Sequence, residues 1–356
     1  MKRHGLCFLL VIALIVSLAG CGGNSGSAAD KSANSAAGSA EEGEEKAVTL
    51  RMSTGHPEEH VASETVREFV DKVEKDSNGS IKIKIYYSNS LGSQDVIVNG
   101  LMDGSVDLSF EYLDASYAPV SDIAALPFIV SNYDELQYLF SPGSNMYSTI
   151  KNSFDEVGIN LLGIYVPGFS GLATKSIPEN YNTCSPKSKP IRVWNSNPAI
   201  EAYEAMGYNC VAIDWSDTYT SIQTGIVDGT TGQTATGVYT FVRDVVNYYI
   251  PYMYGPDYVH LVISQKTFNN LSQEQQDIIQ NAAETTISKV YENLENMENE
   301  SLKQLEDAGI EVLPLTDDER NEIAEQVRET VWPSQEEVFG KDILNSIYED
   351  LEACKK

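Results

Sequence analysis

Beyond residue 47, the hydrophobic positions of the chain alternate between the spacing typical of strands and the spacing typical of helices. Residues 48–53 favour a strand, and the segment after Gly55-His56-Pro57 places apolar side chains at i, i+4, i+7, i+8 and i+11. These side chains are Ala62, Val66, Phe69, Val70 and Val73. Residues 81–85 then alternate isoleucine with lysine, as expected of a half-buried strand. The order of strand, helix and strand predicts a mostly parallel sheet with helices on its faces.

The same alternation continues through the middle of the chain. Three further helical segments are predicted: one between Leu91-Gly92-Ser93 and Gly104, the mostly helical 133–157, and one from Asn197-Pro198 to Met206. Further strands are predicted at 106–110, 159–166, 191–194 and 211–213. A helix follows, with Ser216 or Asp217 as its predicted N-cap. In α/β folds of this kind, ligands bind at the carboxyl ends of the strands.

A very long amphipathic helix is predicted after Ser272, which suits an N-cap position. Its apolar stripe consists of Ile279, Ala283, Ile287, Val290, Leu294, Met297 and Leu305. About ten turns of ~5.4 Å each exceed the size of one lobe, so the helix is expected to bridge two lobes. The alternative of a coiled-coil stalk is weakened by Gly309 and by the strand-like residues 310–313. The chain of 356 residues is long enough for two lobes with separate cores.

The N-terminus predicts a lipoprotein signal peptide. Lys2-Arg3 precedes the apolar residues 8–18, and Leu18-Ala19-Gly20-Cys21 follows. The apolar run is too short for a membrane span, which needs about 20 residues. Residues 1–20 would be removed, and acyl chains on Cys21 would anchor the protein at the outer face of the cell membrane or in the periplasm. The alternative is an ordinary secretion signal in which the cysteine is a coincidence.

Residues 21–47 are rich in Gly, Ser, Ala, Asn and acids, which is typical of a flexible acidic linker. The whole chain has a formal net charge of −28, and removal of the two cations of the signal gives −30. Such a surface repels phosphate backbones, so nucleic acid is not an expected partner. An anionic ligand would have to be bound by local cations.

Three cysteines remain beyond Cys21, namely Cys184, Cys210 and Cys354, at spacings that match no zinc ribbon or redox motif. A Cys184–Cys210 disulfide is conceivable outside the cytoplasm, but it is not our expectation. His56, Glu59 and His60 fit the H-x-x-E-H spacing of a zinc hydrolase. We expect no metal there, because Pro57 suits the first helical position and leaves His56 in the preceding loop.

The segment around Arg192 carries the most informative chemistry. Arg192 ends an apolar run, residues 214–219 begin a helix rich in aromatic side chains, and residues 225–229 form a turn bracketed by glycines. This arrangement can hold a small anion between two lobes. The alternative is that Arg192 is only the partner in a surface salt bridge, as most charged residues are exposed.

Eight short pieces occur in the order seen in DctP-type substrate-binding proteins of tripartite ATP-independent (TRAP) transporters, which the chain resembles over roughly residues 48–335. The pieces are Gly55-His56, Leu91-Gly92-Ser93, Gly104-Ser105-Val106-Asp107, Leu126-Pro127-Phe128, Gly168-Phe169, Ile191-Arg192-Val193, Tyr219 and Gly225-Ile226-Val227-Asp228-Gly229. The resemblance implies a two-lobed, periplasmic-binding-protein-like α/β fold, a type II-like flytrap with a long helix across both lobes. Lobe I would comprise residues 48–167 and about 258–297, and lobe II residues 168–257 and about 298–356.

The resemblance also implies a function without catalysis or cofactors. The protein would capture a small organic acid outside the cytoplasm and deliver it to the small and large membrane subunits of the transporter. Alternatives are a ligand-binding component for a sensor kinase, an importer driven by ATP, which the long helix and the ordered pieces disfavour, and the zinc hydrolase built on His56 and His60.

Residue by residue, the resemblance implies a site centred on Arg192. Arg192 matches the family arginine that binds a substrate carboxylate through two parallel N–H donors. Many members carry a second arginine after Gly-Phe, where this chain has Ser170. The usual Gln-Glu-Asn-Pro is replaced by residues 230–233, with Gln233 as a possible substitute for the asparagine. With one cation fewer, a monocarboxylate is favoured over a dicarboxylate.

Several aromatic residues accompany these positions at strand ends and helix starts that would face the cleft. They are Tyr112, Phe169, Trp194, Trp215, Tyr219 and Tyr239. Their rings could stack on an aromatic or apolar ligand tail, although each could equally be a packing residue. Trp194 is the strongest of them, because it shares a strand face with Arg192, and Tyr219 follows from the motif. His56 and Gln94, in or beside the pieces above, complete the candidate set.

Overall fold

The structure, a computed structural model, describes residues 47–113 and 117–354. The predicted signal peptide 1–20, the predicted lipid attachment at Cys21 and the linker 21–47 except its last residue lie outside the described residues. Within the described part, no helix is both long and apolar enough to cross a membrane.

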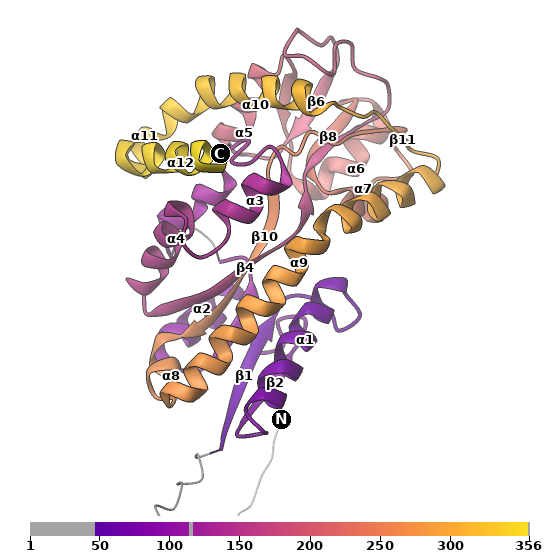
Figure 1. Cartoon of the computed structure of the whole chain (residues 1–356). Helices are drawn as coiled ribbons and strands as arrows, with labels where there is room; N and C mark the ends of the chain where they lie inside the picture. Colours follow the sequence, from indigo (N-terminus) through magenta and orange to yellow (C-terminus); the bar gives the residue numbers. More distant parts are fainter. Residues whose placement is uncertain (1–46, 114–116, 355–356) are drawn as a thin grey trace, which may run out of the picture. The chain divides into compact units, whose positions relative to one another are not determined.

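The described strands form two sheets, the first with five strands in the order β2-β1-β3-β10-β4 (Figure 1). Its strands are β1 (Val48–Thr54), β2 (Ile81–Tyr86), β3 (Leu108–Glu111), β4 (Ile159–Phe169) and β10 (Pro256–Ser264). β1 pairs in parallel with β2 and β3, whereas β10 is antiparallel to β3 and β4. The strand, helix, strand order at the start of the chain is therefore confirmed, with the parallel pairing that it predicted.

The second sheet has six strands in the order β11-β9-β5-β8-β6-β7. Its strands are β5 (Gly171–Thr174), β6 (Pro190–Val193), β7 (Asn209–Ala212), β8 (Gly229–Gln233), β9 (Tyr248–Ile250) and β11 (Glu311–Val312). β6 pairs in parallel with β7 and β8, but β5 is antiparallel to β8 and β9. Both sheets are thus mixed, whereas the sequence predicted a mostly parallel sheet. The difference arises because β4 continues into β5, and β9 into β10, without the intervening helix that parallel neighbours need.

The described helices cover both sheets. They are α1 (Val61–Asp76), α2 (Gln94–Asp103), α3 (Tyr133–Leu139), α4 (Asn145–Asp155), α5 (Asn197–Ala205), α6 (Trp215–Thr224), α7 (Ala235–Phe241), α8 (Gln265–Asn269), α9 (Gln273–Asp307), α10 (Asp317–Val331), α11 (Glu336–Phe339) and α12 (Lys341–Cys354), with 3-10 turns η1 (Pro119–Ala125) and η2 (Trp332–Gln335). Two helix starts differ from the prediction. α1 begins at Val61 instead of Pro57, and α6 begins at Trp215 after Asp214.

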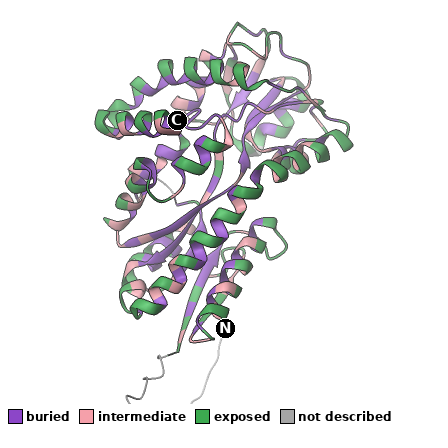
Figure 2. Ribbon diagram, viewed as in Figure 1, coloured by how far each residue is buried: buried purple, intermediate pink, exposed green. Residues whose placement is uncertain are grey.

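The long helix α9 is confirmed, with 35 residues and a capping box between Ser272 and Gln275. Its buried residues between Ile279 and Leu294 belong to the core of the first sheet. Leu302 and Leu305 belong to a separate cluster on the second sheet. The helix therefore passes from one core to another between Leu294 and Leu302. Figure 2 shows the corresponding alternation of buried and exposed residues along α9, in contrast to the mostly buried strands.

The C-terminal helices depart from the expected lobe assignment. α12 packs against α3 and α4, and Leu344, Ile347 and Leu351 are buried in the core of the first sheet. The prediction that lobe II includes all residues to the C-terminus is therefore wrong for α12. The amphipathic pattern of α12 required an apolar partner but could not specify which one.

Candidate functional site

Arg192 is a buried cation on β6, flanked in the sheet by β7 and β8. Its neighbours Ile191 and Val193 belong to an apolar cluster, and Arg192 as a residue is only 4% exposed. Nε donates a hydrogen bond to the carbonyl of Ile213 at 2.8 Å. No carboxylate of the described residues lies within 4 Å, so the alternative of a surface salt bridge is wrong. Burial lowers the pKa of Arg192, and the attraction of Asp214, from beyond 4 Å, opposes that effect. A ligand carboxylate in direct contact would stabilise the buried charge further.

An exposed aromatic pair adjoins the guanidinium. The ring of Trp215, at the first position of α6, lies 5.6 Å from Arg192 Cζ. Trp215 also makes an edge-to-face contact with Phe241 at 5.5 Å, and the two side chains are 40% and 55% exposed. Tyr219, one turn further along α6, is 38% exposed. Phe241 escaped the sequence analysis, because a single aromatic residue at a helix end carries no distinguishing pattern.

Trp194 lies directly after β6 and is half-buried. Its ring meets Tyr254 edge to face at 5.8 Å. Gly232 adopts a φ of +79°, and a Cβ atom there would come within 2.8 Å of the Trp194 ring. Gln233 turns its amide back to the carbonyl of Gly232, at 3.0 Å. The departure from the family pattern at residues 230–233 thus makes room for an indole ring.

Phe169 and Ser170 form the crossing from the first sheet to the second. The Phe169 ring is buried against Tyr133, with ring centroids 5.7 Å apart, and its backbone N–H donates to Glu298 Oε1 at 2.6 Å. Ser170 donates from its backbone N–H and its hydroxyl to the carbonyl of Gly255, at 2.9 and 3.2 Å. Both residues are therefore tied to neighbouring elements rather than to Arg192.

Three candidates lie beside the first sheet: Tyr112 directly after β3, Gln94 at the start of α2, and His56 after β1. The Gln94 amide donates to the carbonyl of Tyr112 at 2.6 Å, so these two predicted residues lie together. The Tyr112 hydroxyl donates to Asp122 at 2.7 Å, and its side chain is 39% exposed. His56 stacks on His60 with ring centroids 4.6 Å apart. Burial and the adjacent His60 lower the pKa of His56 to about 4.

The geometry does not favour a zinc site at this histidine pair. α1 begins after both residues, so the helical face that the motif requires does not form. His60 is the N-cap, and its Nδ1 accepts the N–H of Ala62 at 3.2 Å. Across residues 47–113 and 117–354, no three His, Cys, Asp or Glu side chains gather in a way that could hold a metal ion. Cys184 and Cys210 are free thiols.

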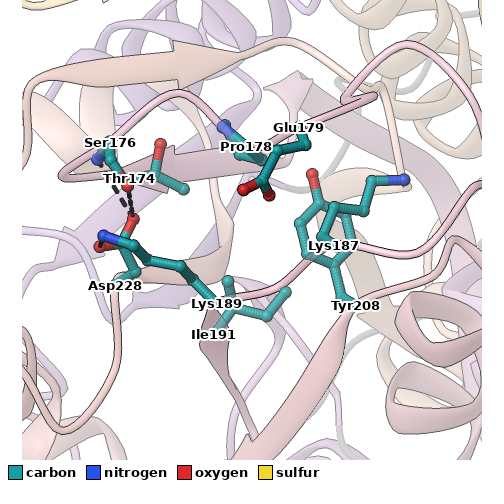
Figure 3. Close-up of a pocket in the computed structure, with 9 residues that line it drawn as sticks. All are labelled: Thr174, Ser176, Pro178, Glu179, Lys187, Lys189, Ile191, Tyr208 and Asp228. Atoms are coloured by element: carbon teal, nitrogen blue, oxygen red, sulfur yellow. Dashed lines mark hydrogen bonds and ion pairs between the residues drawn. The ribbon is translucent and has the colours of Figure 1, made fainter.

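Asp228 of the Val-Asp-Gly turn supports the loop that precedes β6 (Figure 3). Its carboxylate accepts the N–H and the hydroxyl of Ser176 at 3.1 and 2.6 Å, and the ammonium of Lys189 at 3.2 Å. The cavity beside it has about 10 Å³, room for one water molecule at most. The most recognisable acid of the motif is thus structural, and this cavity cannot accept an organic acid.

A larger cavity of about 260 Å³ lies among α9, α4 and β4, away from Arg192. Its lining residues are Phe140, Ser141, Pro142, Tyr147, Leu162, Gly163, Glu284, Ile287, Ser288 and Tyr291. Glu284 is the only charged residue in this set, so the cavity does not suit an anion.

Comparison with known proteins identifies related chains. The family described as bacterial extracellular solute-binding protein, family 7 (DctP), matches residues 52–337. The ectoine-binding periplasmic protein TeaA of Halomonas elongata is 23% identical over 299 residues, which cover 79% of this chain and 84% of TeaA. The 2,3-diketo-L-gulonate-binding periplasmic protein YiaO of Escherichia coli is 21% identical, with 80% and 84% coverage.

Solved structures show the same fold. A TRAP periplasmic solute-binding protein from Ochrobactrum anthropi superposes with a TM-score of 0.77 at 19% identity, covering 87% of this chain and 96% of that one. A second, from Sulfitobacter sp. NAS-14.1 with bound β-D-galacturonate, gives a TM-score of 0.66 at 24% identity, covering 84% and 99%.

Proposed function

Because the chain belongs to family 7 of the bacterial extracellular solute-binding proteins, the DctP family, we propose that it captures a small organic monocarboxylate for a TRAP transporter. The observation that carries this proposal is the buried Arg192, whose guanidinium lies beside Trp215 with no carboxylate of the described residues within 4 Å. Two parallel N–H donors of a guanidinium match the two oxygens of one carboxylate.

The charges around Arg192 support a ligand with one carboxylate rather than two. Ser170 stands where many members of the family carry a second arginine, and its hydroxyl is already bonded to the Gly255 carbonyl. Lys187 is buried, and its ammonium donates hydrogen bonds to the carbonyls of Thr183 and Met206. Lys189 pairs with Asp228. These two lysines are therefore engaged in the fold and are not available to bind a second ligand carboxylate.

The exposed rings beside Arg192 support an aromatic or apolar ligand body. Trp215 and Tyr219 lie on α6 with more than a third of their surface free. Stacking on such rings contributes about 0.5–1.5 kcal/mol beyond the burial of apolar area. A single solvated ion pair contributes only about 0–1 kcal/mol, so tight binding requires that the site close and exclude water.

The proposed mechanism is a shift between open and closed lobes. The ligand carboxylate binds Arg192 on the second sheet, and Tyr112, Gln94 and His56 of the first sheet close over the remainder. Contacts made only in the closed form shift the population toward it. The membrane subunits of the transporter would recognise the closed form.

We further propose that acyl chains on Cys21 anchor the protein outside the cytoplasm. We also propose that the lobes divide near residues 167 and 257, with α9 crossing between them.

Calorimetry on the purified mature protein tests the proposal. A thermal-shift screen with D-galacturonate, benzoate, other aromatic and aliphatic monocarboxylates, and succinate identifies the ligand class, since a bound ligand raises the apparent stability. Arg192→Ala is expected to weaken binding of the best acid at least about 30-fold, because truncating one partner of a desolvated charge pair costs about 2–5 kcal/mol.

The controls separate binding from folding. The melting temperature of unliganded Arg192→Ala is expected to stay close to that of the wild type. Arg192→Lys keeps the charge but loses the paired donors, and it should bind with intermediate affinity. Unaltered affinity in Arg192→Ala would refute the assignment of the carboxylate site. A preference for succinate over every monocarboxylate would refute the single-carboxylate part.

A further inference from the structure

Two of the segments that pass between the cores of the two sheets are bonded to each other. One is the crossing at Phe169 and Ser170, between β4 and β5. The other is the middle of α9, between Leu294 of the first core and Leu302 of the other cluster. Glu298 lies midway along that stretch, and its Oε1 accepts the Phe169 N–H at 2.6 Å. This bond therefore links two segments that cross between the cores.

Glu298 is held from three sides at the crossing. Its Oε2 accepts the hydroxyl of Tyr133 on α3 at 3.2 Å. A Cβ atom on Gly168 would come within 2.8 Å of Oε1, so the carboxylate fits here because that residue is glycine. Arg320 of α10 attracts the carboxylate, and its buried Nε has no hydrogen-bond partner in the part of the chain that the structure describes.

We infer that Glu298 is a positioning residue that fixes the crossing segment, and that proton binding to its carboxyl group makes ligand affinity depend on pH. The inference rests on the proposed function, because it concerns the segment that carries Phe169 and Ser170. A charged carboxylate accepts an N–H bond about twice as strongly as a neutral group. Ionised Glu298 therefore holds Phe169 firmly, and protonated Glu298 holds it weakly.

The surroundings place this titration in the physiological range. Burial raises the pKa of Glu298 to about 7, against the opposing effects of the Phe169 N–H, the Tyr133 hydroxyl and Arg320. The titratable or charged groups that interact with it are Tyr133 on α3, Tyr249 on β9 and Arg320 on α10. Two further acids lie close by: Glu295 on the same helix also acts on Tyr133, and Asp257 pairs with Gly168 in the register of β4 and β10. Burial raises the pKa of both tyrosines further above their usual range, so neither tyrosine titrates near pH 7.

A measurement without ligand tests the bond between Glu298 and Phe169 itself. In the wild-type mature protein, the amide resonance of Phe169 is expected to shift with pH, with a midpoint near 7. In Glu298→Gln the amide oxygen can still accept the N–H bond but carries no proton equilibrium, so the shift should disappear. Glu300→Gln, an exposed carboxylate two positions further along α9, is the matched control and should titrate like the wild type. A Phe169 resonance that does not move between pH 5.5 and 8.5, or moves equally in Glu298→Gln, would overturn the inference.

A binding measurement tests the consequence. With D-galacturonate or benzoate as the probe, whichever binds more tightly, the wild-type dissociation constant is expected to rise about threefold to tenfold from pH 8 to pH 6. Glu298→Gln should show a flat profile, and Gly168→Ala, which displaces the carboxylate, should also lose the pH dependence. If both probes fail to bind, the proposed ligand class is contradicted. The Phe169 measurement still tests whether Glu298 titrates and controls the bond to Phe169. A wild-type profile that Glu298→Gln leaves unchanged counts against the inference.

Discussion

The carboxylate of Asp228 accepts two hydrogen bonds from Ser176, one from the backbone N–H at 3.1 Å and one from the hydroxyl at 2.6 Å. Asp228 directly precedes β8, and Ser176 follows β5. The bonds therefore join the ends of two antiparallel neighbours, β5 and β8, in the middle of the second sheet. The Val-Asp-Gly turn that helps to identify the family is thus a structural clamp in this chain.

Replacing this aspartate is expected to affect stability more than binding. Asp228→Ala leaves the Ser176 N–H and hydroxyl unpaired in a half-buried site, and we expect a loss of about 1–3 kcal/mol in the free energy of unfolding. Ser176→Ala removes only the hydroxyl and should cost less. Urea unfolding gives the stability, and calorimetry with the best acid gives the affinity. A large loss of affinity in Asp228→Ala with unchanged stability would instead assign the residue to the ligand site.

Arg328 and Glu135 form a buried ion pair that connects α10 to α3. Nη2 of Arg328 lies 3.1 Å from Glu135 Oε2, with side chains 9% and 7% exposed. The same oxygen accepts the N–H of Ser131, and Arg328 Nε donates to the carbonyl of Phe128 at 2.7 Å. Glu135→Ala would leave the guanidinium buried without its partner, so a loss of about 3–5 kcal/mol is expected.

The double variant Glu135→Leu with Arg328→Met provides the control for this pair. Removing both charges avoids an unpaired one, so the double variant should lose less stability than Glu135→Ala alone. Chemical denaturation of the three proteins measures the difference. If the double variant is the least stable of the three, the pair is net stabilising, and the desolvation argument fails here.

The space that Gly232 provides for Trp194 can be tested with two glycine variants. Gly232 and Gly225 have nearly the same φ, +79° and +80°, so an alanine is strained at either position by about 1–3 kcal/mol. Only at Gly232 would the new Cβ meet a ring, because nothing lies within 4 Å of a Cβ at Gly225. Both variants should lose stability, but only Gly232→Ala should also displace Trp194. Tryptophan fluorescence and ligand affinity distinguish them, and equal ligand affinity in the two variants would argue against a role of Trp194 in binding.

The sequence predicted those elements whose side-chain periodicity is strong. The apolar face of α1 and the stripe of α9 are buried as expected, because helical spacing determines which side chains share a face. The predicted start of α1 at Pro57 is wrong, because the imidazole of His60 caps a helix that begins at Val61. The partner of α12 could not be predicted either, since an amphipathic face indicates burial without indicating the surface it meets.

The candidate site likewise contains residues that the sequence could predict and residues that it could not. The resemblance to the family led to Arg192, and the exposed ring of Trp215 lies against it. The bond from Glu298 to Phe169 joins residues 129 positions apart in the sequence, and no local pattern marks it. Glu298 is one of many acids on a helix whose acids are mostly exposed. Its partial burial arises where α9, α3 and the crossing strand meet.

That burial predicts how stability should vary with pH. The pKa of the Glu298 carboxyl is raised from 4.5 to about 7 in the folded protein, mainly by desolvation. Between these values the folded protein binds the proton and the unfolded chain does not, so the contribution of this group to stability falls as pH rises from about 4.5 to 7. At about 1.4 kcal/mol for each pH unit, the full loss is about 3 kcal/mol.

Glu298→Gln removes this proton equilibrium. The free energy of unfolding of the variant should be similar to that of the wild type near pH 4.5 and higher above pH 7.5, by up to about 3 kcal/mol if the amide keeps the bond to Phe169. Urea unfolding across this pH range measures the difference, with Glu300→Gln as the exposed control. A difference that is constant with pH would show that Glu298 titrates near 4.5 in the folded protein, and the carboxylate would then be fully charged at every physiological pH.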